Sequence, residues 1–323
     1  MNQLDPSLKV SILIMTYNHA HFIRKAIDSV LMQQVNFNHE IVISEDFSTD
    51  GTREIVIEYQ EKYSGKIRLL LSQKNLHSNE VVARGITACK GEYIALLDGD
   101  DYWTSPHKLQ KQVDFLDKYP ECSMCFHNAT AFYEDGSKEP WTWTPTNQKE
   151  FSTLEDIWLG NFIATCSTMF RNRAFGEVPK WYSFFPITDW PLHILNAEQG
   201  KIGYINEVMG AYRYHRGGDY SLLSQEQKLR TTFNFYHLMN YNLGFRYNNL
   251  IKIALSNYFY EWAEEYEKNG DLENAKTCLK VCITGKPINK FIPLSKLLKK
   301  WIKFNSPQLV QLKRNFLSTK YSN

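Results

Sequence analysis

Short apolar runs alternate with helix-like segments along the first hundred residues of this 323-residue chain. The run VSILIM at 10–15 is continuous and rich in β-branched residues, as expected for a strand that is covered on both faces. Similar short strands are predicted at 40–44, 66–72 and 93–97, with helices between them. Strands that alternate with helices predict βαβ units, and therefore an α/β fold with a mainly parallel sheet flanked by helices.

Polar clusters follow three of the predicted strands. TYN at 16–18 follows the first strand, EDFSTD at 45–50 follows the second, and DGDD at 98–101 follows the fourth. Ligands of open parallel sheets bind beyond the carboxyl ends of the strands, so we expect these loops to line one crevice. In the second loop, Ser48 or Thr49 is expected to cap the helix that follows.

The acids Asp98, Asp100 and Asp101 stand directly after a buried strand, where they cannot belong to the core. Carboxylates at alternate positions past a strand can converge on a divalent cation, and hard oxygen ligands suit Mg²⁺ or Mn²⁺. A solvated acidic turn is the alternative, because Asp-Gly-Asp is common in turns.

The pattern changes in the second half of the chain. After the acids, a helix is predicted with Ser105 as its N-cap and Pro106 as its first residue. Beyond about residue 221 the pattern is helical, and 257–285 resembles a single tetratricopeptide-type hairpin joined at Asn-Gly-Asp. We therefore expect an α/β domain over 1–220 and a helical C-terminal region over 221–323.

Six cysteines are scattered through the chain, and the N-terminal residues lack the basic and apolar regions of a signal peptide. Free thiols and a cytoplasmic location are expected. Cys122, Cys125 and His127 could suggest a metal knuckle, but no second Cys/His pair completes a recognisable four-ligand spacing. Buried strand residues are the preferred interpretation of these three.

The net charge of +2 conceals a strong asymmetry, because eleven basic residues and no acid follow Glu273. The segment LSKLLKKWIKF at 294–304 places leucines, Trp301 and Ile302 on one face and lysines around the other. Such a basic amphipathic helix can make peripheral contact with an anionic membrane, here the inner face of the cell membrane, or can dock on the preceding hairpin. Nucleic-acid binding is not expected, because the aromatic residues of the tail form no stacking platform.

Five motifs, in order, closely resemble the inverting glycosyltransferases of the GT-A fold, family two. The resemblance covers about residues 9–221, and its motifs are VSILIMTYNHAHFIRKAIDSVLMQQ, EIVISEDFSTDGT, CKGEYIALLDGDDYW, ITDWPLHILNAEQGKIGYI and YRYHRGG. It implies a nucleotide-diphosphate sugar donor, bound Mn²⁺ or Mg²⁺, and a hydroxyl acceptor on a glycan or lipid-linked oligosaccharide. Such chemistry suits bacterial cell-surface polysaccharide synthesis.

The resemblance also assigns residues to the donor. Thr16, Tyr17 and Asn18 would line the nucleotide pocket, and Asp46 would accept a hydrogen bond from the base. Asp98 would bind the ribose or the donor sugar. For Asp46, the alternative is a turn acid that precedes a helix.

The same resemblance assigns Asp100 and His215 as metal ligands, and Arg213 or Arg216 as a contact for the donor phosphates. Asp101 is expected to be structural, as a partner of Trp103 or of the following helix. Arg84 receives no role, because VVARGITACKGEY departs from the Arg and Asn pattern of many relatives.

Asp189 stands where the family has its general base, which takes the proton of the acceptor hydroxyl as the new bond forms. An N-cap role is the alternative, and it would leave a non-catalytic sugar-nucleotide or glycan-binding module. The string QKLRT at 227–231 departs from the Q-x-x-R-W of processive members, so single-sugar addition is expected. A nucleotidyltransferase is disfavoured, because no glycine-rich phosphate loop precedes the first helix.

Overall fold

The computed structural model describes residues 4–218, 223–284 and 291–305. These residues form two compact units. The first comprises the described residues up to Ile157 and from Asn161 to Lys228, and the second comprises Trp158–Gly160 and the described residues from Leu229 onwards.

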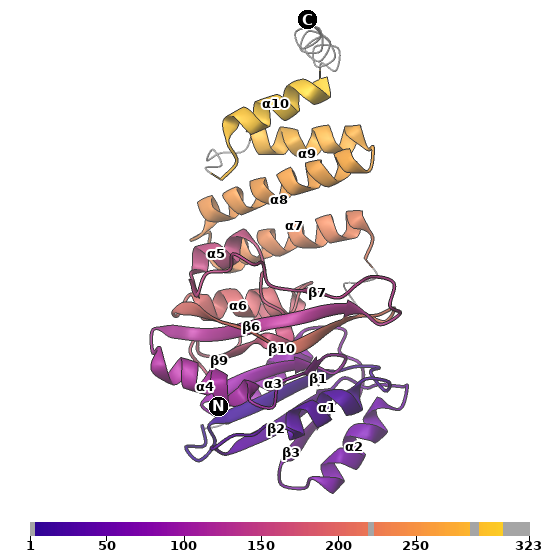
Figure 1. Ribbon diagram of the computed structural model, residues 1–323, viewed down its shortest axis with the longest axis vertical. Helices are drawn as coiled ribbons and strands as arrows, with labels where there is room; N and C mark the ends of the chain where they lie inside the picture. The colour runs from indigo at the N-terminus through magenta and orange to yellow at the C-terminus, as the bar shows by residue number, and fades with distance from the viewer. Residues whose placement is uncertain (1–3, 219–222, 285–290, 306–323) are drawn as a thin grey trace, which may run out of the picture. The chain divides into compact units, whose positions relative to one another are not determined.

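One sheet of ten strands lies in the described part of the first unit (Figure 1). Its strands are β1 (Val10–Thr16), β2 (His39–Glu45), β3 (Ile67–Leu71), β4 (Tyr93–Asp98), β5 (Tyr102–Trp103), β6 (Cys122–Tyr133), β7 (Trp141–Thr142), β8 (Phe151–Ser152), β9 (Met169–Arg171) and β10 (Lys201–Tyr214). The order is β3-β2-β1-β4-β9-β6-β10-β5, with β7 beside β6 and β8 beside β10.

The helices flank the sheet in the first unit and make up most of the second. Their bounds are α1 (Ile23–Leu31), α2 (Thr52–Lys62), α3 (Glu80–Ala88), α4 (Lys108–Lys118), α5 (Leu154–Leu159), α6 (Asp189–Ala197), α7 (Gln225–Asn242), α8 (Asn248–Lys268), α9 (Leu272–Thr284) and α10 (Leu294–Asn305). Two 3-10 turns, η1 (Thr165–Ser167) and η2 (Lys180–Phe184), also belong to the first unit.

Strands β3, β2, β1 and β4 run parallel, which confirms the predicted α/β fold and its parallel sheet. Thr16 of β1 pairs with Glu45 of β2, and Met15 pairs with Asp98 of β4, so the three strands end at one level. The short strands β5, β7, β8 and β9 join the sheet antiparallel. The loops after β1, β2 and β4 therefore emerge side by side at one edge.

The continuous apolar runs are buried because helices cover both faces of the sheet. Ile12, Leu13 and Ile14 of β1 have no exposed surface. Helix α3 comes close to β1 at Gly85, where an added Cβ would lie 2.5 Å from a Leu13 methyl carbon. A glycine at this position lets the helix pack tightly on the strand.

The expected cap of α2 by Ser48 or Thr49 is wrong. The helix begins at Thr52, after Gly51 with φ of 99°, and Thr52 N donates to Asp50 Oδ1 at 3.0 Å. The left-handed glycine turns the chain so that Asp50, rather than Ser48, reaches the first turn.

The expected start of α4 at Ser105 and Pro106 is also wrong. The helix begins at Lys108, and the Leu109 N–H donates to Gln33 Oε1 at 3.1 Å. Because a glutamine from the loop after α1 satisfies this first-turn donor, Ser105 need not cap the helix.

The six cysteines are buried and have free thiols. Cys122, Cys125 and His127 lie within β6, as the buried-strand interpretation predicts. His127 Nδ1 lies 2.8 Å from Asn128 O, and burial lowers the pKa of this histidine to about 3.

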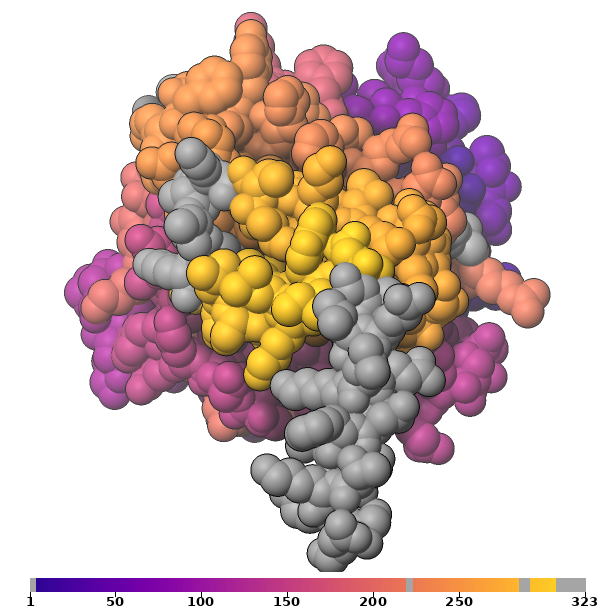
Figure 2. All heavy atoms as spheres, turned by 90° about the horizontal axis from the view of Figure 1, so that it is seen from above, coloured from indigo at the N-terminus to yellow at the C-terminus, as the bar shows by residue number. Residues whose placement is uncertain are grey.

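In the second unit, α8 and α9 are joined at Asn-Gly-Asp and pack against each other, with Leu297 and Phe304 of α10 in the same buried cluster. The helix α10 is therefore docked, yet Leu294, Leu298 and Ile302 remain 60%, 49% and 47% exposed. Figure 2 looks onto α9 and α10, in orange-yellow and yellow. Among the described residues, no helix is long and apolar enough to cross a bilayer.

Candidate functional site

The loop after β1 is tied to the loop after β2. Asn18 has φ of 54°, its N–H donates to Ser48 Oγ at 2.9 Å, and its Oδ1 accepts from Thr49 N at 2.9 Å. Thr16 is buried, whereas the Tyr17 side chain is 41% exposed. Asn18 thus braces the two loops, and Tyr17 presents its ring at the edge of the sheet.

Asp46 is buried directly after β2. Its N–H donates to Thr16 O at 3.0 Å, and its Oδ1 accepts from Ser72 Oγ at 2.9 Å and from Leu76 N at 3.1 Å. A carboxylate offers about four lone-pair positions, so these contacts leave acceptor capacity for a ligand. Asp46 is thereby held between the β1 edge and the loop after β3.

Arg84 of α3 reaches the same edge. Its guanidinium donates to Ser44 Oγ at 2.9 Å, Glu45 O at 2.8 Å and Leu70 O at 2.9 Å. Burial lowers the pKa of Arg84, and the charges of Asp46 and Glu45 oppose this effect. The guanidinium holds the ends of β2 and β3 together.

Gly99 lets the acid loop approach the loop after β1. A Cβ built on Gly99 would lie 2.6 Å from Thr16 Oγ1 and 2.9 Å from His19 Nδ1. Any side chain at Gly99 would push these groups away, so the Asp-Gly-Asp spacing has a steric basis.

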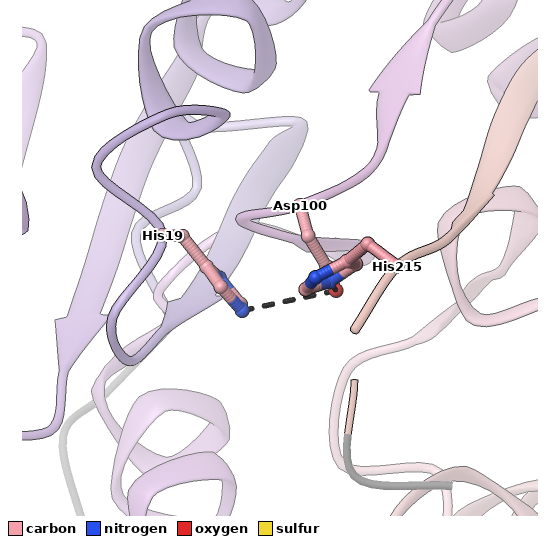
Figure 3. Close-up of side chains that lie close together, drawn as sticks. All are labelled: His19, Asp100 and His215. Carbon is pink, nitrogen blue, oxygen red and sulfur yellow. Dashed lines mark hydrogen bonds and ion pairs between the residues drawn. The ribbon is translucent and has the colours of Figure 1, made fainter. Parts of the chain in front are cut away.

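His19, Asp100 and His215 lie together at this edge (Figure 3). Asp100 Oδ2 is 2.9 Å from His215 Nε2 and 3.7 Å from His19 Nε2, and one ligand atom from each residue lies within 4.8 Å of the others. Burial would raise the pKa of Asp100, but the hydrogen bond to His215 and the charges of both histidines lower it. The three residues come from three separate segments of the chain.

Two imidazole nitrogens and one carboxylate oxygen suit a divalent transition metal. Mg²⁺ prefers an octahedral shell made of oxygen, whereas imidazole suits softer ions and carboxylate suits Mn²⁺. The donor set therefore fits Mn²⁺ better than Mg²⁺.

Arg213 of β10 is buried and has several partners. Its Nε donates to Asp100 O at 2.7 Å, its Nη1 pairs with Glu134, and its guanidinium carbon lies 4.6 Å from the Phe22 ring centroid. Its side chain is 6% exposed, which leaves little of the guanidinium open to a phosphate. Arg216 is exposed and is not subject to this restriction.

Asp101 is buried behind the acid loop, and its Oδ1 accepts from Arg213 N at 2.8 Å. Burial and the charges of Asp100 and Asp98 raise the pKa of Asp101 well above its usual range. The expected structural role is present, but through the backbone of β10. The Trp103 indole instead donates to Cys166 O at 2.8 Å.

Asp189 is the first residue of α6, and the N-cap is Thr188. Asp189 Oδ2 accepts from Asn161 Nδ2 at 2.8 Å, and Oδ1 accepts from Trp190 N at 2.7 Å. The carboxylate side chain remains 20% exposed. It is therefore oriented by neighbours and still accessible.

The buried Tyr182 hydroxyl donates to Thr188 O, one residue before Asp189, at 2.8 Å. The pKa of Tyr182 is raised well above its usual range, first by burial and then by the charges of Asp189 and Asp98.

His19, Asn161 and Asn79 were not among the expected site residues. The Asn79 side chain donates to the segment before Asp189. His19 could have been found, because it lies in the polar loop after the first strand. The two asparagines act across long sequence separations, and no pattern marks them.

Sequence and structure relate the chain to known proteins. The chain matches the family described as Glycosyl transferase family 2 over residues 11–178. An uncharacterized protein of Mycobacterium tuberculosis is 37% identical over 65% of this chain and 60% of its own length. A Bacillus subtilis protein named as a teichuronic acid biosynthesis glycosyltransferase is 30% identical over 63% of this chain and 78% of its own length. The chain thus spans about three fifths of the length of the mycobacterial relative.

Among solved structures, residues 1–349 of S. aureus TarS in complex with UDP-GlcNAc superpose with a TM-score of 0.55 and 18% identity. The superposition covers 92% of this chain and 79% of that chain, and it shows a shared fold. Since the family match covers more than half of the sequence, the chain belongs to glycosyl transferase family 2.

Proposed function

We propose that this protein is a metal-dependent, inverting glycosyltransferase that moves one sugar from a nucleotide-diphosphate sugar to a hydroxyl group. The observation that carries the proposal is the cluster of His19, Asp100 and His215 at the carboxyl edge of the parallel strands, beside Asp46. Ligands of open parallel sheets bind at this edge, and a cation there neutralises a diphosphate.

The donor would occupy the loops after β1, β2 and β4. Tyr17 and Thr16 would line the base pocket with Asn18 as their brace, and Asp46 would accept a hydrogen bond from the base. Asp98 would hold the ribose or the donor sugar. The TarS structure contains UDP-GlcNAc, which makes uracil the first base to test.

Bound Mn²⁺ would stabilise the negative charge that develops on the leaving diphosphate. His19, Asp100 and His215 would hold it. Arg216, which is exposed, would contact the phosphates more readily than Arg213, whose guanidinium is already paired with Glu134.

Asp189 would act as the general base. Its carboxylate takes the proton of the acceptor hydroxyl while that oxygen attacks the anomeric carbon from the face opposite the diphosphate, so the configuration inverts. The hydrogen bond from Asn161 fixes the Asp189 carboxylate in one orientation and leaves it 20% exposed to an acceptor. The departure of the string at 227–231 from the processive motif favours single-sugar addition.

A lipid-linked or other cell-surface glycan is the acceptor class that we propose. The helix α10 supports membrane contact, because Leu294, Leu298 and Ile302 are exposed on one side and Lys299 and Lys303 are exposed beside them. Apolar side chains flanked by lysines suit an anionic bilayer surface. Co-sedimentation with vesicles containing phosphatidylglycerol, but not with pure phosphatidylcholine, would support it, and Leu298→Ser should weaken it. Equal binding to both vesicles would contradict it.

The first test is a thermal-shift series with UDP, GDP and dTDP sugars, each with and without Mn²⁺. A ligand that binds only the native state raises the unfolding midpoint by mass action. We expect one base to raise the midpoint in a Mn²⁺-dependent manner, and Asp100→Ala to remove the metal dependence. No shift with any nucleotide in either metal state would overturn the proposal.

A non-catalytic sugar-nucleotide or glycan-binding module is the second candidate. It is favoured by one observation, that both Asp189 oxygens already accept hydrogen bonds from the chain. The two candidates differ in turnover. Only an enzyme releases nucleotide from the donor and loses this activity in the Asp189→Asn variant.

A further inference from the structure

One amide side chain contacts several residues of the segment before Asp189. Asn79 Nδ2 lies 3.1 Å from both Phe185 O and Ile187 O, and Asn79 Oδ1 accepts from Thr188 Oγ1 at 3.0 Å. The segment includes η2 and a stretch without regular structure, so its backbone groups depend on partners from outside. Asn79 therefore sets the path of the chain that enters α6.

Asn79 also ends the loop that holds Asp46. Leu76 N donates to Asp46, and three residues later Asn79 N donates to Ser183 O at 3.1 Å. The loop over 72–79 is thus bonded to the proposed base-binding acid at one end and to the segment that carries Asp189 at the other.

Few side chains could replace the Asn79 amide, which both donates and accepts hydrogen bonds here. Asn79 precedes α3 as its N-cap, yet its side chain makes no capping hydrogen bond to that helix. It is 9% exposed, and it presents donors to carbonyl oxygens and an acceptor to a hydroxyl. A carboxylate at this position would face the same carbonyl oxygens with no proton to donate.

We propose that Asn79 is a positioning residue that couples occupancy of the nucleotide pocket to the placement of Asp189. When a base binds at Asp46, it constrains the loop over 72–79 that is bonded to this acid, and Asn79 transmits that constraint to the 182–188 segment. This inference rests on the proposed function, because it takes Asp46 as a donor contact and Asp189 as the base.

The kinetic test uses the full-length protein and the nucleotide sugar that raises its unfolding midpoint. It measures the rate of nucleotide release. Asn79→Ala should lower kcat about 10- to 100-fold with less than a threefold change in the donor KM, because a small displacement of a reacting group is costly. Asn79→Asp should behave similarly, because it cannot donate to the carbonyl oxygens. Asn75→Ala is the matched control, since it loses a turn bond to His77 N in the same loop and should keep kcat within twofold.

Thr188→Val should lower kcat by about threefold on its own, because it removes the hydroxyl that donates to Asn79. In the double variant with Asn79→Ala, Thr188→Val should lower kcat almost no further, because both changes break the same contact. Additive losses, or an unchanged kcat in Asn79→Ala, would overturn the inference.

Hydrogen exchange supplies a readout that does not depend on turnover. UDP with Mn²⁺ should slow amide exchange over 182–190 in the wild-type protein and much less in Asn79→Ala. If Asn79→Ala does not fold, the wild-type measurement still decides, because unchanged exchange over 182–190 would exclude the coupling. A protein that binds no nucleotide refutes the proposed function, whereas binding without altered exchange or kcat refutes only the role of Asn79.

Discussion

The two halves of the candidate site are built in different ways. The proposed donor half consists of loops that directly follow adjacent parallel strands, and these loops bond to one another across about thirty residues, as Asn18 does with Ser48 and Thr49. The half that carries Asp189 follows an irregular segment. Its path depends on Asn79, whose contact with Thr188 joins residues 109 positions apart.

This difference predicts that ligand binding and turnover depend on different parts of the site. Strand register places the donor loops, so a change there should mainly alter nucleotide or metal affinity. A few long-range side-chain contacts place Asp189, so a change on that side should mainly alter the rate of transfer. Three substitutions test this division, from the largest expected effect to the smallest, and a fourth tests a buried lysine that belongs to neither half.

Asp189→Asn should lower kcat by about 10²–10⁴-fold, because the amide cannot accept the acceptor proton. Asparagine keeps an oxygen for one of the two hydrogen bonds that Asp189 accepts. The nucleotide dissociation constant, measured by calorimetry, should stay within a factor of three of the wild-type value. Retained turnover would remove Asp189 from the base role, and a protein without turnover in either form would favour the binding module.

His19→Ala should raise the Mn²⁺ concentration needed for half-maximal activity by at least tenfold, because one of three ligands is lost. His21→Ala is a matched control on the same loop, since that side chain is exposed. A metal titration of donor turnover compares the two variants. Equal metal dependence in both would exclude His19 from the metal site.

Asp46→Asn should weaken UDP binding by about tenfold, because it replaces a charged acceptor for the base with a neutral one. Binding of inorganic pyrophosphate with Mn²⁺ should stay unchanged, since the phosphates lie elsewhere. Isothermal calorimetry with both ligands separates these effects. Equal losses for the two ligands would indicate that Asp46 only supports the fold.

Lys108→Met should leave activity unchanged and stabilise the protein. Lys108 is fully buried against the Trp103 ring at 3.8 Å, and among the described residues its Nζ has no hydrogen-bond partner. Burial lowers the pKa of Lys108 to about 7. The variant should therefore unfold about 3 °C or more above the wild type at pH 7.

The stabilisation by Lys108→Met should depend on pH in a defined direction. Between pH 7 and 10.5 the unfolded chain holds a proton on Lys108 that the folded chain has lost. Wild-type stability should therefore rise with pH across this window, and the advantage of the methionine variant should shrink. A constant difference in unfolding midpoint from pH 7 to 10 would contradict this account.

Much of the donor half could be predicted from local pattern. A continuous apolar run at 10–15, followed by polar residues, indicated a buried strand with a ligand loop at its end, and parallel pairing placed Asp98 and the loop of Asp46 at one edge. The helix starts were predicted less well. Gln33 and Asp50 satisfy first-turn donors that neighbouring serines were expected to satisfy, because the folded chain offers several acceptors at each helix end.

The sequence by itself determined the α/β alternation, the positions of β1 to β4 and the chemistry of the loops that follow them, because burial and strand pairing follow from the periodicity of apolar residues. Only the tertiary structure decided that His19 joins Asp100 and His215, that Arg213 pairs with Glu134, and that Asn79 holds the segment before Asp189. These contacts join residues that are far apart along the chain. Their formation depends on how the packed elements meet, and no local pattern of polar and apolar residues encodes that.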